Sequence, residues 1–406
     1  MLSTTLTPTG APVSDPATND LGVYVHWPYC LRICPYCDFN VYKNRDVDAS
    51  AWQGAFARQL TQTAAMVTPR PLHSLYFGGG TPSLAPLPIL RSVIDQCETL
   101  FGFHPGAEIT LEANPANLTR DQMQDVAALG ITRLSLGVQS FDDRLLKVLG
   151  RDHNGQQASA AIDAAQSIFG NVTFDLIYGH PDQSLDQWQA ELTHATQFET
   201  GHLSVYQLTI EPHTAYGRAV DRGRMIPKDG DVLADFDDLA MGHLSAYGFD
   251  RYEISNLSRP GFEAIHNLIY WRYQDYIGIG PGAHGRLTLG DNVKGHAPGT
   301  RIETCAPRRP EVYLESQTAE NFYEIFDPLD AEAQMQERFA MGLRLRAGIA
   351  LTRDDHFFTD EERTRALALA CADGLARYDN CQLVPTDRGR KLLNRLLDML
   401  LAPVAG

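Results

Sequence analysis

Three cysteines lie within eight residues of one another near the start of the chain, in the pattern Cys30-x3-Cys34-x2-Cys37. Three thiolates on one short loop can ligate three irons of a [4Fe-4S] cube and leave the fourth iron open to a substrate or cofactor. A structural zinc site normally needs a fourth ligand, for which His26 is the nearest candidate. The spacing therefore favours an iron–sulfur cluster, with zinc or a reactive thiol group as the alternatives.

Several other residues with polar or minimal side chains lie at or close to the ends of predicted β-strands. Glycine lets a ligand approach the backbone closely. Carboxylates suit ribose hydroxyls or an ammonium group, arginine suits a carboxylate, and glutamine both donates and accepts hydrogen bonds. Taken singly, each is more often structural, and the glycine triplet lacks the G-x-G-x-x-G spacing of a Rossmann dinucleotide site. The residues are Gly78, Gly79, Gly80, Thr81, Glu112, Gln139, Arg151 and Asp175.

Short β-branched or aromatic runs alternate with longer amphipathic stretches over the first two thirds of the chain, which predicts repeated βα units. Parallel strands require such crossover helices, so the pattern fits either a doubly wound sheet or a partial barrel. The polar residues at the strand ends favour the barrel, because active sites of α/β barrels gather there. The predicted strands are 23–26, 72–77, 108–112, 133–138, 172–178 and 203–208, and the predicted helices are 49–66, 87–100, 121–129, 156–168 and 185–196.

The organisation along the chain has four predicted parts. Residues 1–20 form a polar tail that we expect to be disordered, and 21–260 form the barrel. Residues 261–328 form a connecting region, and 329–406 form a small, mainly helical domain with a winged-helix look. A helix predicted at 388–401 combines a basic start with an apolar stripe. Such a stripe usually packs on its own domain, and the alternative is transient docking on a membrane or a partner.

The amino-acid composition excludes some classes of partner and favours one cellular compartment. The chain has 406 residues with 34 Lys or Arg, 50 Asp or Glu and a formal net charge of −16. This acidity argues against nucleic acid as a partner. Seven cysteines, three of them clustered, fit metal ligation better than disulfide pairing. The sequence has neither the features of a signal peptide nor 18 consecutive apolar residues, so we expect a cytoplasmic protein.

Six motifs occur in a fixed order along the chain: YVHWPYCLRICPYCDF, YFGGGTPSL, LEANP, RLSLGVQSF, GRDH and FDLIYGHP. This series resembles the coproporphyrinogen oxidase-like branch of the radical S-adenosylmethionine (SAM) superfamily. The resemblance implies a partial (β/α)6 barrel. It also implies a [4Fe-4S] cluster on the three clustered cysteines, with the amine and carboxylate of SAM on the open iron. An electron donor is needed if SAM is cleaved.

The resemblance also assigns site residues. Some match positions that contact SAM in relatives, and others match positions near a second SAM of the oxidase branch, so one or two SAM molecules remain possible. Thr209 and His284 align near the same region less securely. The SAM-contact positions are Tyr24, Gly79, Glu112, Gln139, Arg151 and Asp175, and those near a second SAM are Tyr36, Gly80 and Thr81.

Two features distinguish the branches of this family. Coproporphyrinogen dehydrogenases resemble one another in carrying C-x3-C-x2-C-x-C, whereas here Phe39 stands where the last cysteine would be. The segment 266–271, HNLIYW, resembles the HNxxYW motif of a heme chaperone branch. That branch implies heme as a ligand, an acceptor hemoprotein as a partner, and His266 as a candidate iron ligand. The alternative for His266 is a hydrogen-bonded packing residue.

The function therefore has one favoured interpretation and two alternatives. We expect a heme chaperone on a radical SAM scaffold. An oxygen-independent coproporphyrinogen III dehydrogenase needs the same cluster, and so does a radical enzyme acting on another substrate. The sequence leaves open whether the protein is an enzyme. Three further histidines near the motifs, His26, His153 and His180, are expected to be structural.

Overall fold

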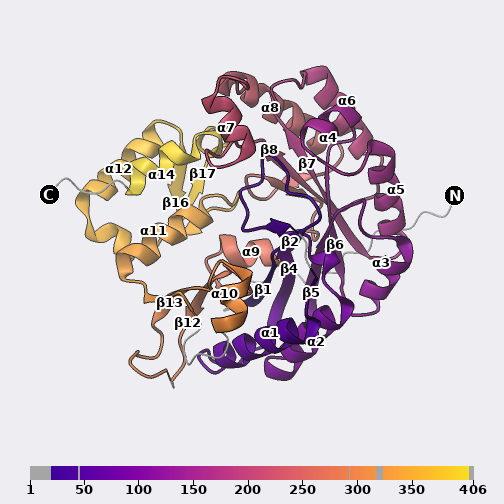
Figure 1. The fold of residues 1–406 in the computed structure, drawn as a ribbon. Helices are drawn as coiled ribbons and strands as arrows, with labels where there is room; N and C mark the ends of the chain where they lie inside the picture. The colour runs from indigo at the N-terminus through magenta and orange to yellow at the C-terminus, as the bar shows by residue number, and fades with distance from the viewer. Residues whose placement is uncertain (1–19, 44–45, 292, 317–322, 402–406) are drawn as a thin grey trace.

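The computed structural model describes residues 20–43, 46–291, 293–316 and 323–401. Of the tail expected at 1–20, residues 1–19 lie outside the described residues. The fold is built on one twelve-stranded sheet, and a second, smaller lobe is formed by the C-terminal segment (Figure 1). The strand order is β14-β13-β12-β11-β1-β4-β5-β6-β7-β8-β10-β9.

The six predicted strands form the centre of this sheet and run parallel to one another in chain order. Helices follow the strands and lie around the outside of the sheet (Figure 1). The strands are β1 (Leu21–Trp27), β4 (Leu72–Gly79), β5 (Phe103–Ala113), β6 (Arg133–Gln139), β7 (Asn171–Tyr178) and β8 (His202–Gln207). The helices are α1 (Ala49–Ala64), α2 (Leu87–Leu100), α3 (Arg120–Ala127), α4 (Asp143–Val148), α5 (Gly155–Gln166) and α6 (Leu185–Ala195), and a short helix η1 (Pro82–Leu84) follows β4.

The local sequence explains where the outer helices begin. Thr119, Asn154 and Ser184 each precede a helix and accept a hydrogen bond from the backbone N–H three residues later. In all three cases the residue at that third position is a glutamine, whose side-chain oxygen accepts from the backbone N–H of the cap residue and so forms a capping box. The strands between them are almost entirely buried, as parallel strands covered on both faces must be.

The segment 261–328, predicted as a connecting region, instead completes the sheet. Strand β11 (Asp275–Ile279) pairs in parallel with β1 on the side away from β4, and three antiparallel strands follow it. The βα pattern fades here because antiparallel neighbours need no crossover helix. The further elements are β12 (His284–Thr288), β13 (Arg301–Cys305), β14 (Ile325–Pro328), α9 (Ile265–Trp271) and α10 (Pro310–Ser316). Beyond β8 lie α7 (Ala215–Asp221), α8 (Gly230–Ala246), β9 (Asp250–Arg251) and β10 (Asn256–Ser258).

A buried aspartate holds this added part of the sheet. Asp275 is 1% exposed and begins β11. Its carboxylate accepts from Arg70 at 2.6 Å and from Arg301 at 2.7 Å, and the backbone N–H of Thr288 donates to it at 3.1 Å. A buried carboxylate needs such charged donors, so this group fixes β11 against its neighbours.

The C-terminal lobe has its own core and the element order of a helix, a strand, a second helix and a hairpin. Phe339 and Phe357 stack at 5.0 Å in this core. The helix predicted at 388–401 is interrupted at Leu392, and Leu396 and Leu400 are buried in the lobe. The apolar stripe of that helix thus packs on its own domain. The elements are α11 (Ala331–Gly342), β15 (Ile349–Ala350), η2 (His356–Thr359), α12 (Glu361–Ala372), β16 (Ala376–Asp379), β17 (Gln382–Pro385), α13 (Asp387–Lys391) and α14 (Leu393–Leu401).

Charged contacts attach this lobe to the sheet. Glu337 of α11 accepts from Arg286 at 2.7 Å and from the Tyr273 hydroxyl at 2.7 Å. Arg344 donates to the fully buried Glu253 at 3.2 Å and lies over the ring of Trp271. The lobe therefore contacts both ends of the sheet, at β12 through Arg286 and beside β9 and β10 through Glu253. Within the described residues, no helix has the length and apolar character needed to cross a membrane.

Candidate functional site

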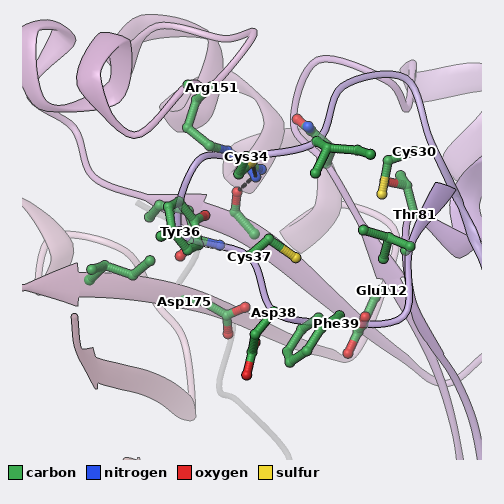
Figure 2. Close-up of a pocket in the computed structure, with 18 of the residues that line it drawn as sticks. Cys30, Cys34, Tyr36, Cys37, Asp38, Phe39, Thr81, Glu112, Arg151 and Asp175 are labelled. Carbon is green, nitrogen blue, oxygen red and sulfur yellow. Dashed lines mark hydrogen bonds between the residues drawn. The ribbon is translucent and has the colours of Figure 1, made fainter. Parts of the chain in front are cut away.

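The three clustered cysteines lie on one loop that leaves the sheet after β1. Cys30 ends the short strand β2 (Tyr29–Cys30), which pairs with β3 (Tyr42–Lys43) and so closes the loop at its base. Cys34 and Cys37 are joined by a turn in which the Cys37 N–H donates to the Cys34 carbonyl at 3.2 Å. All three thiols are free and half-buried. Figure 2 shows these three cysteines around one cavity.

Contacts with distant parts of the chain fix the shape of this loop. The Asn40 side chain donates to the carbonyls of Pro281 at 3.0 Å and Arg308 at 2.8 Å. At the far end, the backbone N–H of Tyr216 donates to the carbonyl of Pro35 at 3.0 Å. The cysteines are thus presented by a loop tied down at both ends, which limits how far each sulfur can move.

The glycine triplet at the end of β4 lies directly under the loop. Gly79 has φ of +104°, and a Cβ there would lie 2.5 Å from the His26 ring. A Cβ on Gly80 would meet the backbone carbonyl of Tyr29 at 2.8 Å. These positions need glycine because of their backbone angle and the close approach of neighbouring atoms. His26 in turn bonds the Tyr24 hydroxyl at 3.0 Å and the Asn40 carbonyl at 2.9 Å, so its role here is structural, as predicted.

Two half-buried carboxyl groups face the cavity from β5 and β7. Glu112 accepts from the Tyr76 hydroxyl at 2.7 Å and from the Gly79 N–H at 3.2 Å. Burial and the nearby Asp175 carboxylate raise the pKa of Glu112 to about 7, and burial raises the pKa of Asp175 to about 6, although Arg151 and Arg133 partly offset that second rise. The cations near these two carboxyls therefore do not balance their charge. The carboxyls favour a positively charged ligand in the cavity.

A guanidinium and a strained glutamine complete this part of the cavity. Arg151 donates to the Cys34 sulfur at 3.4 Å and to the Gly137 carbonyl at 2.7 Å. Gln139, at the end of β6, has φ of +70°, a conformation that is uncommon for a residue with a side chain. Backbone strain of this kind is concentrated at binding sites, where the surrounding structure holds it.

One cavity of about 370 Å³ brings together most of the predicted site residues. This volume is ordinary for a small-molecule site. Thr209, aligned less securely, lines it as well. The predicted residues that line it are Cys30, Cys34, Cys37, Tyr36, Gly79, Gly80, Thr81, Glu112, Gln139, Arg151 and Asp175.

Tyr24 and His266, also predicted as site residues, lie elsewhere. Tyr24 lines a second cavity of about 520 Å³ that shares Phe39, Gly79 and Glu112 with the first. His266 is 1% exposed, and its ring nitrogens bond the Ser74 hydroxyl at 2.7 Å and the Tyr270 hydroxyl at 2.8 Å. Burial lowers the pKa of His266 to about 3, so the ring is neutral.

Two of the histidines that were expected to be structural, His153 and His180, form hydrogen bonds within the protein. His153 is buried and bonds the Val138 carbonyl at 2.9 Å, and His180 is buried and accepts from the Asp182 N–H at 3.2 Å. The remaining cysteines are unclustered, with Cys97 and Cys305 buried. These residues support the loops around the site and do not form a second group of metal ligands.

Tyr76 and Tyr206 belong to the site but were not predicted from the sequence. Tyr76 holds Glu112, and Tyr206 lines the first cavity. Both lie on central strands, where alternate residues face the same side. Tyr76 is two positions before Gly78 and therefore shares its face. The alternation along β4 was the signal that could have identified it.

The cysteine loop fits an iron–sulfur cube. Such a cube takes one thiolate on each ligated iron, so its ligands surround the cluster and do not converge on a single ion. In the part of the chain that the structure describes, no three His, Cys, Asp or Glu side chains converge on a single-ion site. Three thiols that line one cavity from a tethered loop are the donor set that a [4Fe-4S] cluster with one open iron requires.

Comparison with known proteins places this site in a family. The model of the Radical SAM superfamily matches residues 24–194, which include the cysteine loop and the carboxyl ends of β1, β4, β5, β6 and β7. The chain is 39% identical over 386 residues to the heme chaperone HemW of Mycobacterium tuberculosis, covering 94% of both chains. It is 34% identical over 390 residues to HemW of Escherichia coli, covering 94% of this chain and 98% of the relative. The chain belongs to the HemW family.

Membership of the HemW family, within the radical SAM superfamily, implies a [4Fe-4S] cluster and SAM. The solved structure of coproporphyrinogen III oxidase HemN from E. coli, a radical SAM enzyme, superposes with a TM-score of 0.77 at 20% identity. That match covers 96% of this chain and 91% of HemN. At this identity the match shows the fold alone, and it confirms the predicted α/β radical SAM architecture with its helical C-terminal region.

Proposed function

We propose that this protein binds heme and delivers it to acceptor hemoproteins. The observation that carries the proposal is its similarity, over nearly its whole length, to relatives named heme chaperones. We place a [4Fe-4S] cluster on Cys30, Cys34 and Cys37 and SAM beside it in the first cavity. When bound, the cluster supplies an electron to SAM, which requires an electron donor as a further partner.

The residues around the first cavity support the assignment of SAM. The pKa values of Glu112 and Asp175 are raised, which shows that nearby cations do not balance their charge, and the sulfonium of SAM carries a positive charge that they would stabilise. Gly79 and Gly80 line this cavity with backbone atoms alone. The roles proposed for Gln139 and Arg151 are to orient polar groups of the same ligand.

Phe39 favours the chaperone over the dehydrogenase. Coproporphyrinogen dehydrogenases are expected to carry a cysteine at this position, and here a phenylalanine that is 65% exposed lies between the two cavities. The structural likeness to HemN concerns the fold and does not add support for decarboxylation. Ligation of heme iron by His266 stays a prediction. For His266 to bind iron, its imidazole must break the hydrogen bond to the hydroxyl of either Ser74 or Tyr270.

The setting that we propose for this function follows from charge and chemistry. A reducing cytoplasm keeps the cluster thiols available to iron. The net charge of −16 disfavours nucleic acid and anionic membrane surfaces as partners.

The test is a titration of the anaerobically reconstituted protein with heme, followed by the Soret band. We expect saturable binding of one heme per chain. Coproporphyrinogen III incubated with the same protein, SAM and a reductant should release no carbon dioxide. Non-saturable heme binding would refute the chaperone function, and carbon dioxide release at many turnovers would establish the dehydrogenase in its place.

A further inference from the structure

The second cavity lies between the sheet and the C-terminal lobe. Its volume is about 520 Å³. Four aromatic residues from the sheet edge and α9 line it, namely Tyr270, Trp271, Tyr273 and Tyr276. Glu337 and Met341 of α11 close it from the lobe. An aromatic, partly enclosed space of this size suits a large planar ligand.

One histidine in this cavity is accessible to a ligand. The His284 side chain is 54% exposed and lies at the start of β12, on a rigid strand. Its Nδ1 lies 3.5 Å from a Glu303 carboxylate oxygen, and its Nε2 lies 3.5 Å from the Cys305 sulfur, so neither nitrogen is held by a short hydrogen bond. A histidine that ligates a metal usually donates its other N–H to a carboxylate. Glu303 is placed to accept from Nδ1 and leave Nε2 as the ligand.

A polar group at the cavity matches the carboxylates of a porphyrin. Arg308 is exposed and forms no ion pair among the described residues. A guanidinium donates strongly to carboxylates. The cavity thus offers an iron ligand, aromatic walls and a carboxylate donor together.

Phe39 connects this cavity to the cysteine loop. Its exposed ring lines both cavities, and Gly79 and Glu112 form the rest of the shared wall. An exposed phenylalanine stabilises the protein little until a ligand covers its ring. A planar macrocycle in the second cavity would cover it. This gives a physical reason for an aromatic residue at the position where the dehydrogenase pattern has a cysteine.

We propose that the second cavity is the heme site, with His284 as the ligand of the heme iron and Arg308 as a donor to a propionate. This inference rests on the proposed function and names its binding site. His266 is then a positioning residue. It packs against the rings of Tyr24 and Tyr270, which line the cavity, and does not line it itself.

The experiment is the heme titration of reconstituted wild-type protein, His284→Ala, His284→Met and His266→Ala. His356→Ala is the matched control, because His356 is 41% exposed, lies 3.3 Å from the Glu332 carboxylate and lines neither cavity. We expect His284→Ala to weaken heme binding at least tenfold. His284→Met should retain heme with a shifted Soret band and an altered spin state by electron paramagnetic resonance, which a purely structural residue would not cause. Phe39→Ser should weaken binding without changing the spectrum.

The outcomes separate the two proposals. If wild type does not bind heme saturably, the proposed function fails. If wild type binds but His284→Ala binds equally well with the same spectrum, the function stands and this site is wrong. If His266→Ala loses the native spectrum while His284→Ala keeps it, the ligand is His266. Iron and sulfide content should be unchanged in every variant. A variant that loses them is replaced by Arg308→Gln, which we expect to weaken the affinity for heme without changing the spectrum. An unchanged affinity of Arg308→Gln for heme would contradict the site.

Discussion

Replacing Glu112 by glutamine should have opposite effects on the stability of the protein without its cofactors and on its affinity for SAM. Glu112 is half-buried in the wall of the first cavity, where the protein around it raises its pKa from 4.5 to about 7 by burial. No cation among the described residues compensates its charge. A group buried in this way serves a ligand at the expense of the fold.

The stability effect has a definite sign. Below about pH 4.5 Glu112 is protonated in both the folded and the unfolded chain. As the pH rises toward 7, only the unfolded chain releases the proton, so the free energy of unfolding falls. Above pH 7 the loss amounts to about 3 kcal/mol, since one pKa unit corresponds to about 1.4 kcal/mol. Glutamine removes this loss but weakens the bonds from Tyr76 and Gly79, which leaves a gain of about 1–2 kcal/mol at pH 8.

The effect on SAM is the reverse. If the cation binds to ionised Glu112, a pKa of about 7 makes the ionised fraction about 0.9 at pH 8 and about 0.1 at pH 6, so the affinity should fall about tenfold between them. Asp175, with a pKa of about 6, adds only about twofold over the same range. Glu112→Gln should therefore weaken SAM binding at pH 8 and reduce the pH dependence to about twofold. Asp175→Asn should keep the tenfold part.

Thermal unfolding of the protein without cofactors and anaerobic calorimetric titration of the reconstituted protein with SAM measure the two effects. The expected pattern is a higher unfolding midpoint of Glu112→Gln at pH 8, and an equal or lower one at pH 5. A wild-type affinity that does not change between pH 6 and pH 8 would refute the reasoning. So would a Glu112→Gln variant that keeps the full pH dependence.

Three further predictions follow from single contacts. Cys34→Ala should lose most of the iron and sulfide and the brown absorbance after anaerobic reconstitution; retention of all three would overturn the cluster assignment. Gly79→Ala should destabilise the protein by about 1–3 kcal/mol in urea unfolding because its Cβ would lie 2.5 Å from the His26 ring and φ is +104°, whereas an unchanged midpoint would mean that the close approach carries no strain. Asp275→Asn should cost about 3–5 kcal/mol of unfolding free energy by leaving buried Arg301 without its carboxylate, and the exposed pair of Arg365 and Glu361 offers a control expected near zero.

The central strands could be predicted from sequence because each carries its own signal. The run at 172–178 is short and rich in β-branched and aromatic residues, and the structure has it as an almost entirely buried strand at Asn171–Tyr178. Strand β11 gave no such signal. Its five residues include one glycine, and two further glycines follow within three residues, which weakens the local strand signal. What identifies the segment as a strand is its pairing with β1, some 250 residues earlier. The local pattern of apolar residues does not show which distant segments pair.

The site divides in the same way. The cysteine loop and the strand-end residues could be predicted from spacing and motif order, and the structure brings them to one cavity. The accessibility of the histidines could not. His266 lies in the motif that suggested an iron ligand, yet it is buried with both nitrogens bonded, whereas His284, which aligned less securely, is exposed. The burial of each histidine depends on how α9 and the C-terminal lobe pack against the sheet. These elements are too far apart in the sequence for a local pattern to show this packing.

The position of β1 has a consequence for synthesis of the chain. Strand β1 is made first, but it lies between β4 and β11, and β11 begins only at Asp275. Until that residue has left the ribosome, one side of β1 is an unpaired edge with its backbone groups free to pair with another chain. Contacts of such long sequence separation form slowly, and nascent chains with open edges are prone to aggregate. A chain that stops short of Asp275 would therefore be expected to aggregate even though its cysteine loop and its six central parallel strands are complete.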